Sequence, residues 1–394
     1  MVNAPMVTLG IEALCSAPPD FLKGKRLALL CNQASTDRHF THSRDLVNAA
    51  FPGQLSCLFS PQHGFFAEKQ DNMIESDHIS DPVTGVPLFS LYGEVRRPTA
   101  AMYEHFDVLL VDIVDVGTRV YTFLYTLAYC MEEAARFGKQ VVVLDRPNPI
   151  GGTQIEGNLL RDACRSFVGL YPIPMRHGLT FGELALLLNQ EFGIGCELTV
   201  IKAEGWQRQM LFADTGLPWV FPSPNMPTPI TALVYPGQVL WEGTNISEGR
   251  GTTLPFELCG APFVNTQAVC DFLKAIPLPG CVLRPLVFEP TANKWAGTPC
   301  RGFHLHVTDP AAFLPYRTSL ALLQAMMRLY PNDFALKQPP YEYEYEKVPL
   351  DLILGDNTLR PNLAAGDALL ALEAGWQDEL ADFGARRERY FLYS

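Results

Sequence analysis

The chain has 394 residues, of which 48% are hydrophobic and 18% are charged. This length and composition allow a large buried core in two domains, or in one large domain with an appendage, and are not typical of a disordered protein. The net charge of −12, without any block rich in lysine and arginine, argues against non-specific binding to nucleic acids.

The cysteines and the N-terminus indicate the compartment. Ten cysteines are scattered without a CxxC pair, and several lie inside apolar runs, which predicts buried reduced thiols rather than disulfides or a zinc site. The first six residues lack the basic and apolar segments of a secretory signal, and no apolar run approaches the roughly 20 residues of a membrane span. We therefore expect a cytoplasmic protein that does not bind membranes; the sequence indicates no oligomeric state.

Short apolar segments alternate with helix-like segments in the first 200 residues. Strands are predicted over residues 26–31, 55–60, 86–90, 108–113, 140–145 and 197–201. Helices are predicted over residues 43–50, 99–105, 122–137 and 180–191. Strands that are apolar on both faces and separated by helices are typical of a parallel, doubly wound sheet in an α/β domain.

Beyond residue 250 the alternation is less regular. Helices are predicted over residues 263–273 and 319–329, with one or two more in 366–383, and strands over 283–288 and 302–307. This pattern favours a smaller α+β domain over residues 251–394 that closes a cleft against a larger domain of residues 1–250. The polar stretch of residues 223–253 is then expected to lie over this cleft.

Polar side chains follow four of the predicted strands directly. Asn32 follows the first strand, His63 the second, residues 112–119 the fourth and residues 145–149 the fifth. Ligands of doubly wound sheets bind beyond the carboxyl ends of the strands. The four clusters therefore predict the rim of one crevice.

Nucleotide-binding and esterase motifs are absent from these turns. The first strand is followed by Asn32 and Gln33 rather than by GxGxxG, and the chain contains neither a GxxxxGK[ST] phosphate loop nor a GxSxG elbow. A dinucleotide needs those glycines for close approach to its pyrophosphate. We therefore exclude NAD and expect no cofactor.

The strand-end residues allow more than one role. Asp115 suits acid–base catalysis, metal binding or capping of the following helix. Arg119, at the mouth of an α/β sheet, is suited to bidentate binding of a carboxylate. Arg146 either binds a ligand or pairs with its neighbour Asp145, and two prolines present Asn148.

The segment before the helix at residues 180–191 combines structural and binding candidates. Thr180 and Glu183 have the spacing of a capping box, which favours a structural role for Glu183. Arg176 and His177 lie just outside the helix and could reach an anion there.

A metal site is an alternative use of the histidines. His63, His177 and Asp112 are possible ligands, but the first domain contains no HxH or HExxH spacing. We expect no metal.

Residues 242–253 consist almost entirely of polar residues and glycine. They contain three glycines, two glutamates and one arginine, with Ile246 as the only aliphatic residue. Such a segment is either a solvated loop or a surface for hydrogen bonding to a ligand with many hydroxyl groups.

Several of these stretches together carry a family resemblance. They include Pro61-Gln62-His63-Gly64-Phe65, Ser90-Leu91-Tyr92-Gly93, residues 115–121, Asp145-Arg146-Pro147-Asn148-Pro149, Met175-Arg176-His177-Gly178, Pro224-Asn225-Met226-Pro227 and residues 242–252. In this order they resemble the exo-β-N-acetylmuramidase (NamZ-type) family, a former domain of unknown function, DUF1343. The resemblance implies a Rossmann-like N-terminal domain, a smaller C-terminal domain and hydrolysis of terminal N-acetylmuramic acid from peptidoglycan fragments.

The implied substrate is an amino sugar or a muropeptide, which an intracellular enzyme would recycle. Its lactyl carboxylate requires an arginine, and its hydroxyl and acetamido groups require amides and hydroxyls. The substrate-binding candidates are Asn32, Gln62, Arg119, Tyr121, Arg146, Asn148, Arg176, His177, Asn225, Asn245 and Arg250.

Catalysis by this route requires two carboxyl groups. Relatives commonly carry a glutamate, a suspected catalytic acid, where this chain has Gln62, and an amide cannot donate a proton as an acid does. The catalytic candidates are therefore Glu68, Asp115 and Glu248, with His63 beside them. The alternatives are a sugar-binding or sensory protein that has lost catalysis, and a metal-dependent hydrolase.

Overall fold

The computed structural model describes residues 6–69 and 73–394. The first five residues, which contributed to the prediction that no secretory signal is present, lie outside the described part.

The large sheet has seven strands in the order β3-β4-β2-β1-β5-β6-β9. All neighbouring strands are parallel except the short edge strand β3, which runs antiparallel to β4. The chain adds strands on one side of β1 and then on the other, so the predicted doubly wound sheet is confirmed. The strands are β1 Leu27–Leu30, β2 Leu55–Ser60, β3 Ile79–Ser80, β4 Pro87–Ser90, β5 Val108–Val111, β6 Gln140–Leu144 and β9 Glu197–Ile201.

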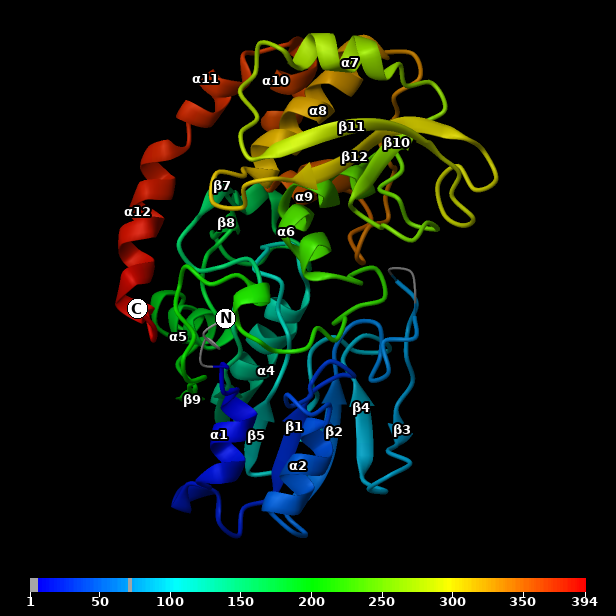
Figure 1. Cartoon of the computed structure of the whole chain (residues 1–394). Helices are drawn as coiled ribbons and strands as arrows, with labels where there is room; N and C mark the ends of the chain where they lie inside the picture. Colours follow the sequence, from blue (N-terminus) through cyan, green and yellow to red (C-terminus); the bar gives the residue numbers. More distant parts are fainter. Residues whose placement is uncertain (1–5, 70–72) are drawn as a thin grey trace.

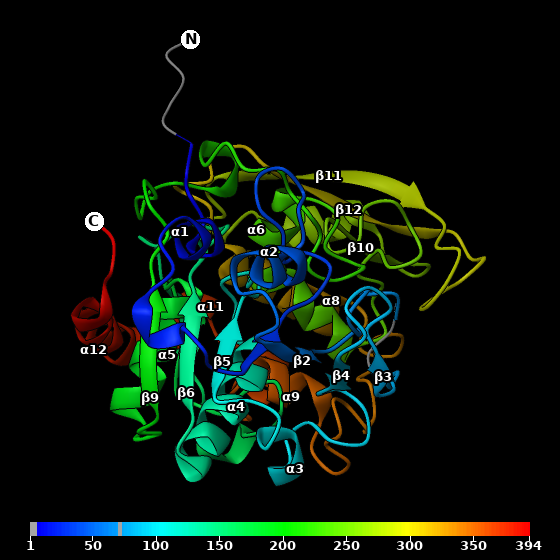
Figure 2. The same ribbon diagram turned by 90° about the horizontal axis from the view of Figure 1, so that it is seen from below.

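Both faces of this sheet are buried because helices cover each of them. Along β1, Ala28 and Leu30 face one hydrophobic cluster, and Leu27 and Leu29 face the other. One layer contains α1 and α2, and the other contains α3, α4 and α5 (Figure 2). Their bounds are α1 Gly10–Ser16, α2 Ser43–Ala50, α3 Ala100–Tyr103, α4 Phe123–Phe137 and α5 Phe181–Glu191.

The ends of two helices agree with local rules. Thr180 and Glu183 form the predicted capping box at the start of α5, through bonds of 3.2 and 3.0 Å. Helix α4 ends at Gly138 in the left-handed conformation. It begins after Thr122, so Asp115 does not cap it.

The C-terminal part contains a three-stranded antiparallel sheet in the order β10-β12-β11, with α7 and α8 packed together beside it. A two-stranded sheet, β7 and β8, lies between the two larger parts (Figure 1). The remaining strands are β7 Glu156–Leu159, β8 Pro174–Arg176, β10 Leu258–Ala261, β11 Cys281–Phe288 and β12 Cys300–Val307. The remaining α-helices are α6 Pro229–Gln238, α7 Thr266–Leu273, α8 Pro315–Leu329, α9 Pro349–Leu354, α10 Leu359–Ala365, α11 Leu369–Ala374 and α12 Gln377–Arg387. Five 3₁₀ helices complete the described part: η1 Asp20–Leu22, η2 Asp162–Cys164, η3 Phe212–Asp214, η4 Val239–Gly243 and η5 Glu388–Tyr390.

The parallel strands of the large sheet point their carboxyl ends toward the C-terminal part (Figure 1). Helix α12 returns from that part along the side of the molecule and packs against β7. The loops after the parallel strands therefore meet the loops of the C-terminal part at one place.

No helix in residues 6–69 and 73–394 is long and apolar enough to cross a membrane.

Candidate active site

A hollow that is open to solvent lies where these loops meet. It is lined from the end of β2, from the loop between β5 and α4, and from segments between β9 and α9. The lining residues are Gln62, His63, Val120, Tyr121, Thr122, Phe123, Val168, Ser223, Asn225, Met226, Tyr235, Glu242, Arg250, Phe256, Tyr341 and Glu342.

The turn after β2 brings two polar side chains into the hollow. His63 and Gly64 both have positive φ values, 72° and 81°, which reverse the chain directly after Gln62. The Nδ1 atom of His63 is 2.7 Å from the carbonyl oxygen of Lys69. Because a carbonyl oxygen only accepts, Nδ1 carries the hydrogen in the neutral ring.

Gln62 is held on three sides. Its Oε1 atom accepts a hydrogen bond from the hydroxyl group of Thr122. Its Nε2 atom donates to Glu342 Oε1 at 3.0 Å and to the hydroxyl oxygen of Tyr92 at 3.1 Å. The Tyr92 hydroxyl in turn donates to Glu342 Oε2 at 2.6 Å. The amide of Gln62 thus fixes a carboxyl group 280 residues further along the chain.

A second carboxyl group, Glu242, belongs to a buried row of alternating charges. Arg250 donates to Glu242 at 2.6 Å and to Glu248 at 3.1 Å. Lys294 donates to the other oxygen of Glu248 at 2.7 Å. The hydroxyl group of Tyr341 donates to Glu242 at 2.6 Å. Each buried charge in this row has an opposite charge or a hydrogen-bond partner beside it, as burial requires.

The two carboxyl groups that line the hollow have pKa values shifted in opposite directions. Burial, reinforced by the charge of Glu242, raises the pKa of Glu342 to about 7, against the hydrogen bonds from Tyr92 and Gln62. Burial also acts to raise the pKa of Glu242, but Arg250 and the hydrogen bond from Tyr341 outweigh it and hold that pKa below its usual value. At neutral pH, Glu242 is therefore ionised and Glu342 is partly protonated.

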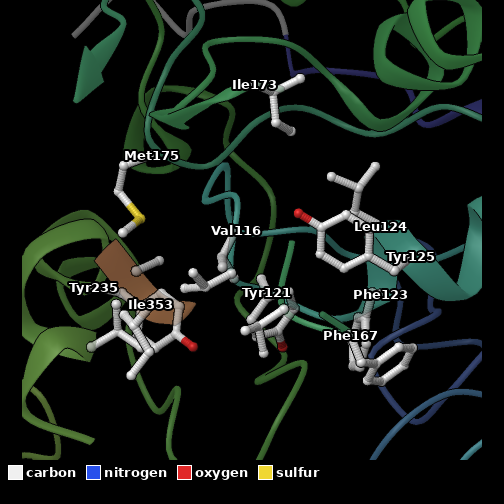
Figure 3. Packing of buried hydrophobic residues seen from close by; sticks show 14 of the residues in the cluster. Val116, Tyr121, Phe123, Leu124, Tyr125, Phe167, Ile173, Met175, Tyr235 and Ile353 are labelled. Carbon is white, nitrogen blue, oxygen red and sulfur yellow. The ribbon is translucent and has the colours of Figure 1, made fainter. Parts of the chain in front are cut away.

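Aromatic side chains form one wall of the hollow. The rings of Tyr121 and Tyr235 meet edge to face at 5.9 Å, and Tyr235 meets Phe256 in the same way at 4.8 Å. Tyr121 and Tyr235 belong to the same packed cluster as Phe123 (Figure 3). This wall is anchored in the core, so it presents a rigid apolar surface to a ligand.

The structure brings five of the predicted site residues to this hollow: Gln62, His63, Tyr121, Asn225 and Arg250. Glu248 lies directly behind Arg250, to which it is bonded, and does not line the hollow. Glu68 lies outside the lining too, with its side chain 49% exposed beside Lys69.

Arg119 does not meet the hollow, contrary to the expected role in carboxylate binding. Its side chain is fully buried and donates to four backbone carbonyl oxygens, those of Asn158, Ile173, Ile353 and Leu354, at 2.8–3.2 Å. Two of these carbonyl groups belong to the last turn of α9, where a positive charge is favourable. Arg119 therefore joins separate parts of the fold.

Three predicted asparagines have their amide groups occupied by the backbone. Asn32 donates to the carbonyl oxygen of Pro222 at 3.0 Å, and Asn148 donates to that of Leu179 at 2.9 Å. Asn245 donates to the carbonyl oxygen of Asp333 at 2.8 Å. None of the three lines the hollow. Their amides connect loops to one another.

The other predicted arginines also lie elsewhere. The guanidinium of Arg146 binds the carboxylate of Asp112 at 2.8 Å. Only the backbone nitrogen of Arg146 donates to Asp145, at 2.9 Å, so the two neighbouring side chains do not form an ion pair. Arg176 donates to the Gln154 side chain and to the Ile150 carbonyl oxygen, and lines a separate hollow with them. These side chains stabilise the loops after the strands.

His177 and Asp115 face each other away from the hollow. The Nε2 atom of His177 lies 3.6 Å from Asp115 Oδ2, which also accepts from the backbone nitrogen of Gly117 at 2.7 Å. Within residues 6–69 and 73–394, no group of three or more His, Cys, Asp or Glu side chains is placed to hold a metal ion.

Glu342 is the main residue of the hollow that the sequence analysis missed, together with Glu242 and Tyr92 as partners of the predicted residues. The run from Tyr341 to Tyr345 alternates tyrosine and glutamate after two prolines and contains no aliphatic residue. This composition marks a loop with a specific role, but nothing in it indicates contact with Gln62.

Comparison with known proteins agrees with this architecture. The model of the family "Exo-beta-N-acetylmuramidase NamZ, N-terminal" matches residues 27–230, and that of "Exo-beta-N-acetylmuramidase NamZ, C-terminal" matches residues 233–393. The peptidoglycan beta-N-acetylmuramidase NamZ of Bacillus subtilis (strain 168) is 43% identical over 389 residues, which cover 99% of this chain and 92% of the relative. The chain belongs to the NamZ family.

Two solved structures of the family share its fold. Both are DUF1343 family proteins of Bacteroides fragilis NCTC 9343. One is 33% identical with a TM-score of 0.88 and covers 99% of both chains. The other is 28% identical with a TM-score of 0.75 and covers 98% of this chain and 99% of its own. The predicted membership of the family and the two-part α/β fold are confirmed. The predicted domain boundary at residue 250 stays a prediction.

Proposed function

We propose that this protein is an exo-acting glycoside hydrolase that releases terminal N-acetylmuramic acid from peptidoglycan fragments. The observation that carries the proposal is the 43% identity, over 99% of the chain, to a peptidoglycan beta-N-acetylmuramidase. The hollow supports it independently, because it offers two carboxyl groups, amides, hydroxyls and an aromatic wall at one place.

We propose that the sugar lies against Tyr121, with Gln62 and Asn225 beside its polar groups. Arg250 is the only lysine or arginine among the described residues that line the hollow. It is therefore our candidate for contact with the lactyl carboxylate, although Glu242 and Glu248 already share its charge. This arrangement predicts that the hollow selects its substrate by shape and hydrogen bonds as well as by charge.

The direct test is turnover of 4-nitrophenyl β-N-acetylmuramide compared with the N-acetylglucosaminide, which lacks the lactyl group. We expect release of 4-nitrophenol, with kcat/KM at least about tenfold higher for the muramide, a difference of ~1.4 kcal/mol. Tight binding of muramic acid without turnover of either compound would instead support a sugar-binding protein. Equal kcat/KM values would contradict recognition of the lactyl group.

We also propose that the protein acts in a reducing compartment such as the cytoplasm. All ten cysteines are free, and seven of them are buried.

A further inference from the structure

Resting on the proposed hydrolysis, we infer that Glu342 is the general acid of this site. It donates its proton to the glycosidic oxygen, while Gln62 and Tyr92 act as positioning residues that hold its carboxyl group.

The geometry of the Glu342 carboxyl group carries this inference. The side chain is 2% exposed and lines the hollow. Gln62 donates to one of its oxygens and Tyr92 to the other, each through one hydrogen bond. Each carboxyl oxygen retains a second lone pair, which can carry the transferable proton. The group is thus oriented without losing its capacity to act as an acid.

The backbone around Glu342 is strained. Its φ is 47° and that of Tyr343 is 65°, values in the left-handed region that residues other than glycine rarely adopt. Phe256, which also lines the hollow, has a φ of 62°. Strained residues gather where a side chain must be placed for function, and Glu342 is placed by Tyr92 and Gln62 from other elements.

The neighbouring carboxyl group completes the pair that hydrolysis requires. Tyr341 bonds to Glu242, while the adjacent Glu342 bonds to Gln62 and Tyr92. The environments favour an ionised Glu242 and a Glu342 that is protonated in a large fraction of molecules near neutral pH. Carboxyl groups whose pKa values are moved apart in this way divide the acid and base roles between them.

Two other polar groups of the hollow are poorer acids. Gln62 has no acidic proton. His63 uses its Nδ1 hydrogen on the Lys69 carbonyl oxygen, so Nε2 of the neutral ring is an acceptor. Glu342 therefore best explains how a hollow with glutamine at position 62 protonates a leaving group.

Hydrolysis breaks the bond between the anomeric carbon and the glycosidic oxygen. The electron pair of this bond goes to the oxygen, which takes the proton of Glu342. A water oxygen then bonds to the anomeric carbon, and the proton that this water loses is taken by a carboxylate of the hollow. One water is consumed, and two sugars with free hydroxyl groups are formed.

The test varies how much the leaving group needs a proton. 4-Nitrophenolate leaves readily without one, whereas the sugar of a β-1,4-linked N-acetylmuramyl–N-acetylglucosamine disaccharide does not. For Glu342→Gln we expect kcat to fall about 10²–10⁴-fold on the disaccharide, because general acid catalysis contributes this much, and less than about tenfold on the aryl muramide. Glu346→Gln, an exposed glutamate of the same loop, is the matched control and should leave both rates unchanged.

The pH profile gives a second readout. The titratable and charged groups that face Glu342 in the described structure are Glu242, Arg250, Lys337, His63, Tyr92, Tyr235, Tyr341 and Tyr343. An acid must be protonated to act, so kcat/KM of the wild type on the disaccharide should fall above pH about 7. Tyr92→Phe removes a hydrogen bond that favours the ionised form of Glu342. The substitution should therefore move the fall in kcat/KM, the alkaline limb of the profile, to higher pH.

The outcomes separate the two proposals. Equal losses on both substrates in Glu342→Gln, or no loss, would overturn the role of Glu342 while the hydrolase assignment stands. If Glu342→Gln does not fold by circular dichroism, Tyr92→Phe decides, and an unshifted alkaline limb overturns the inference. A wild-type protein inactive on both substrates would overturn the proposed function and this inference with it.

Discussion

Arg119 and Arg250 use their buried positive charges in different ways. Both are among the residues predicted to bind the substrate. Arg250 lines the hollow, whereas Arg119 is enclosed by carbonyl groups that include those of Ile353 and Leu354. Those partners lie more than 230 residues away in the chain, so no local pattern distinguishes the two arginines.

The role of Arg119 is tested by Arg119→Leu. The substitution leaves four buried carbonyl oxygens without their donor, and each unsatisfied group costs about 1–3 kcal/mol. We expect a fall of at least about 3 kcal/mol in the free energy of unfolding, measured by urea denaturation, with KM of the folded enzyme unchanged. Arg301→Leu, at an exposed position of β12, is the control. Unchanged stability with a raised KM would instead assign Arg119 to the substrate.

Among the helices and strands, the sequence predicted six of the seven strands of the large sheet, and the long helices, to within a few residues. Runs such as Leu27–Leu30 and Val108–Val111 are apolar on both faces. This composition is typical of a strand that is covered by helices on both sides of the sheet. It missed the helices α1, α6, α9 and α10, the edge strand β3, strand β10 and the β7–β8 pair. β7 contains Gly157 and Asn158 and shows no alternation of apolar and polar residues. Its formation depends on tertiary contacts, so the local sequence does not indicate a strand.

The end of α9 gives a prediction at this scale. Gly355 ends the helix with a φ of 72°, and a Cβ atom there would lie 2.4 Å from Arg119 Nη2. Gly355→Ala should therefore lower the melting temperature by several degrees more than Gly53→Ala. Gly53 has a similar φ of 74° but open space around it, so it measures the backbone cost alone. Equal shifts in differential scanning calorimetry would mean that Arg119 moves aside without cost.

At the scale of the whole molecule, the doubly wound order places the ends of β2 and β5 beneath the loops of the C-terminal part. The sequence predicted a crevice at this edge, but it could not predict which strand ends would line it. The loops after β1 and β6 line a different hollow, whose wall includes Ala34 and Arg146. Contacts such as Asn32 with Pro222 and Arg146 with Asp112 hold these loops, and periodicity does not reveal such long-range partners.

We expect the sugar to bind in the hollow between Gln62, Arg250 and Glu342. The most direct measurement is a crystal structure with N-acetylmuramic acid bound. We predict that the sugar lies against Tyr121, with its anomeric oxygen within hydrogen-bond distance of the Glu342 carboxyl group. A sugar bound only elsewhere, such as in the hollow beside Arg176, would contradict the account.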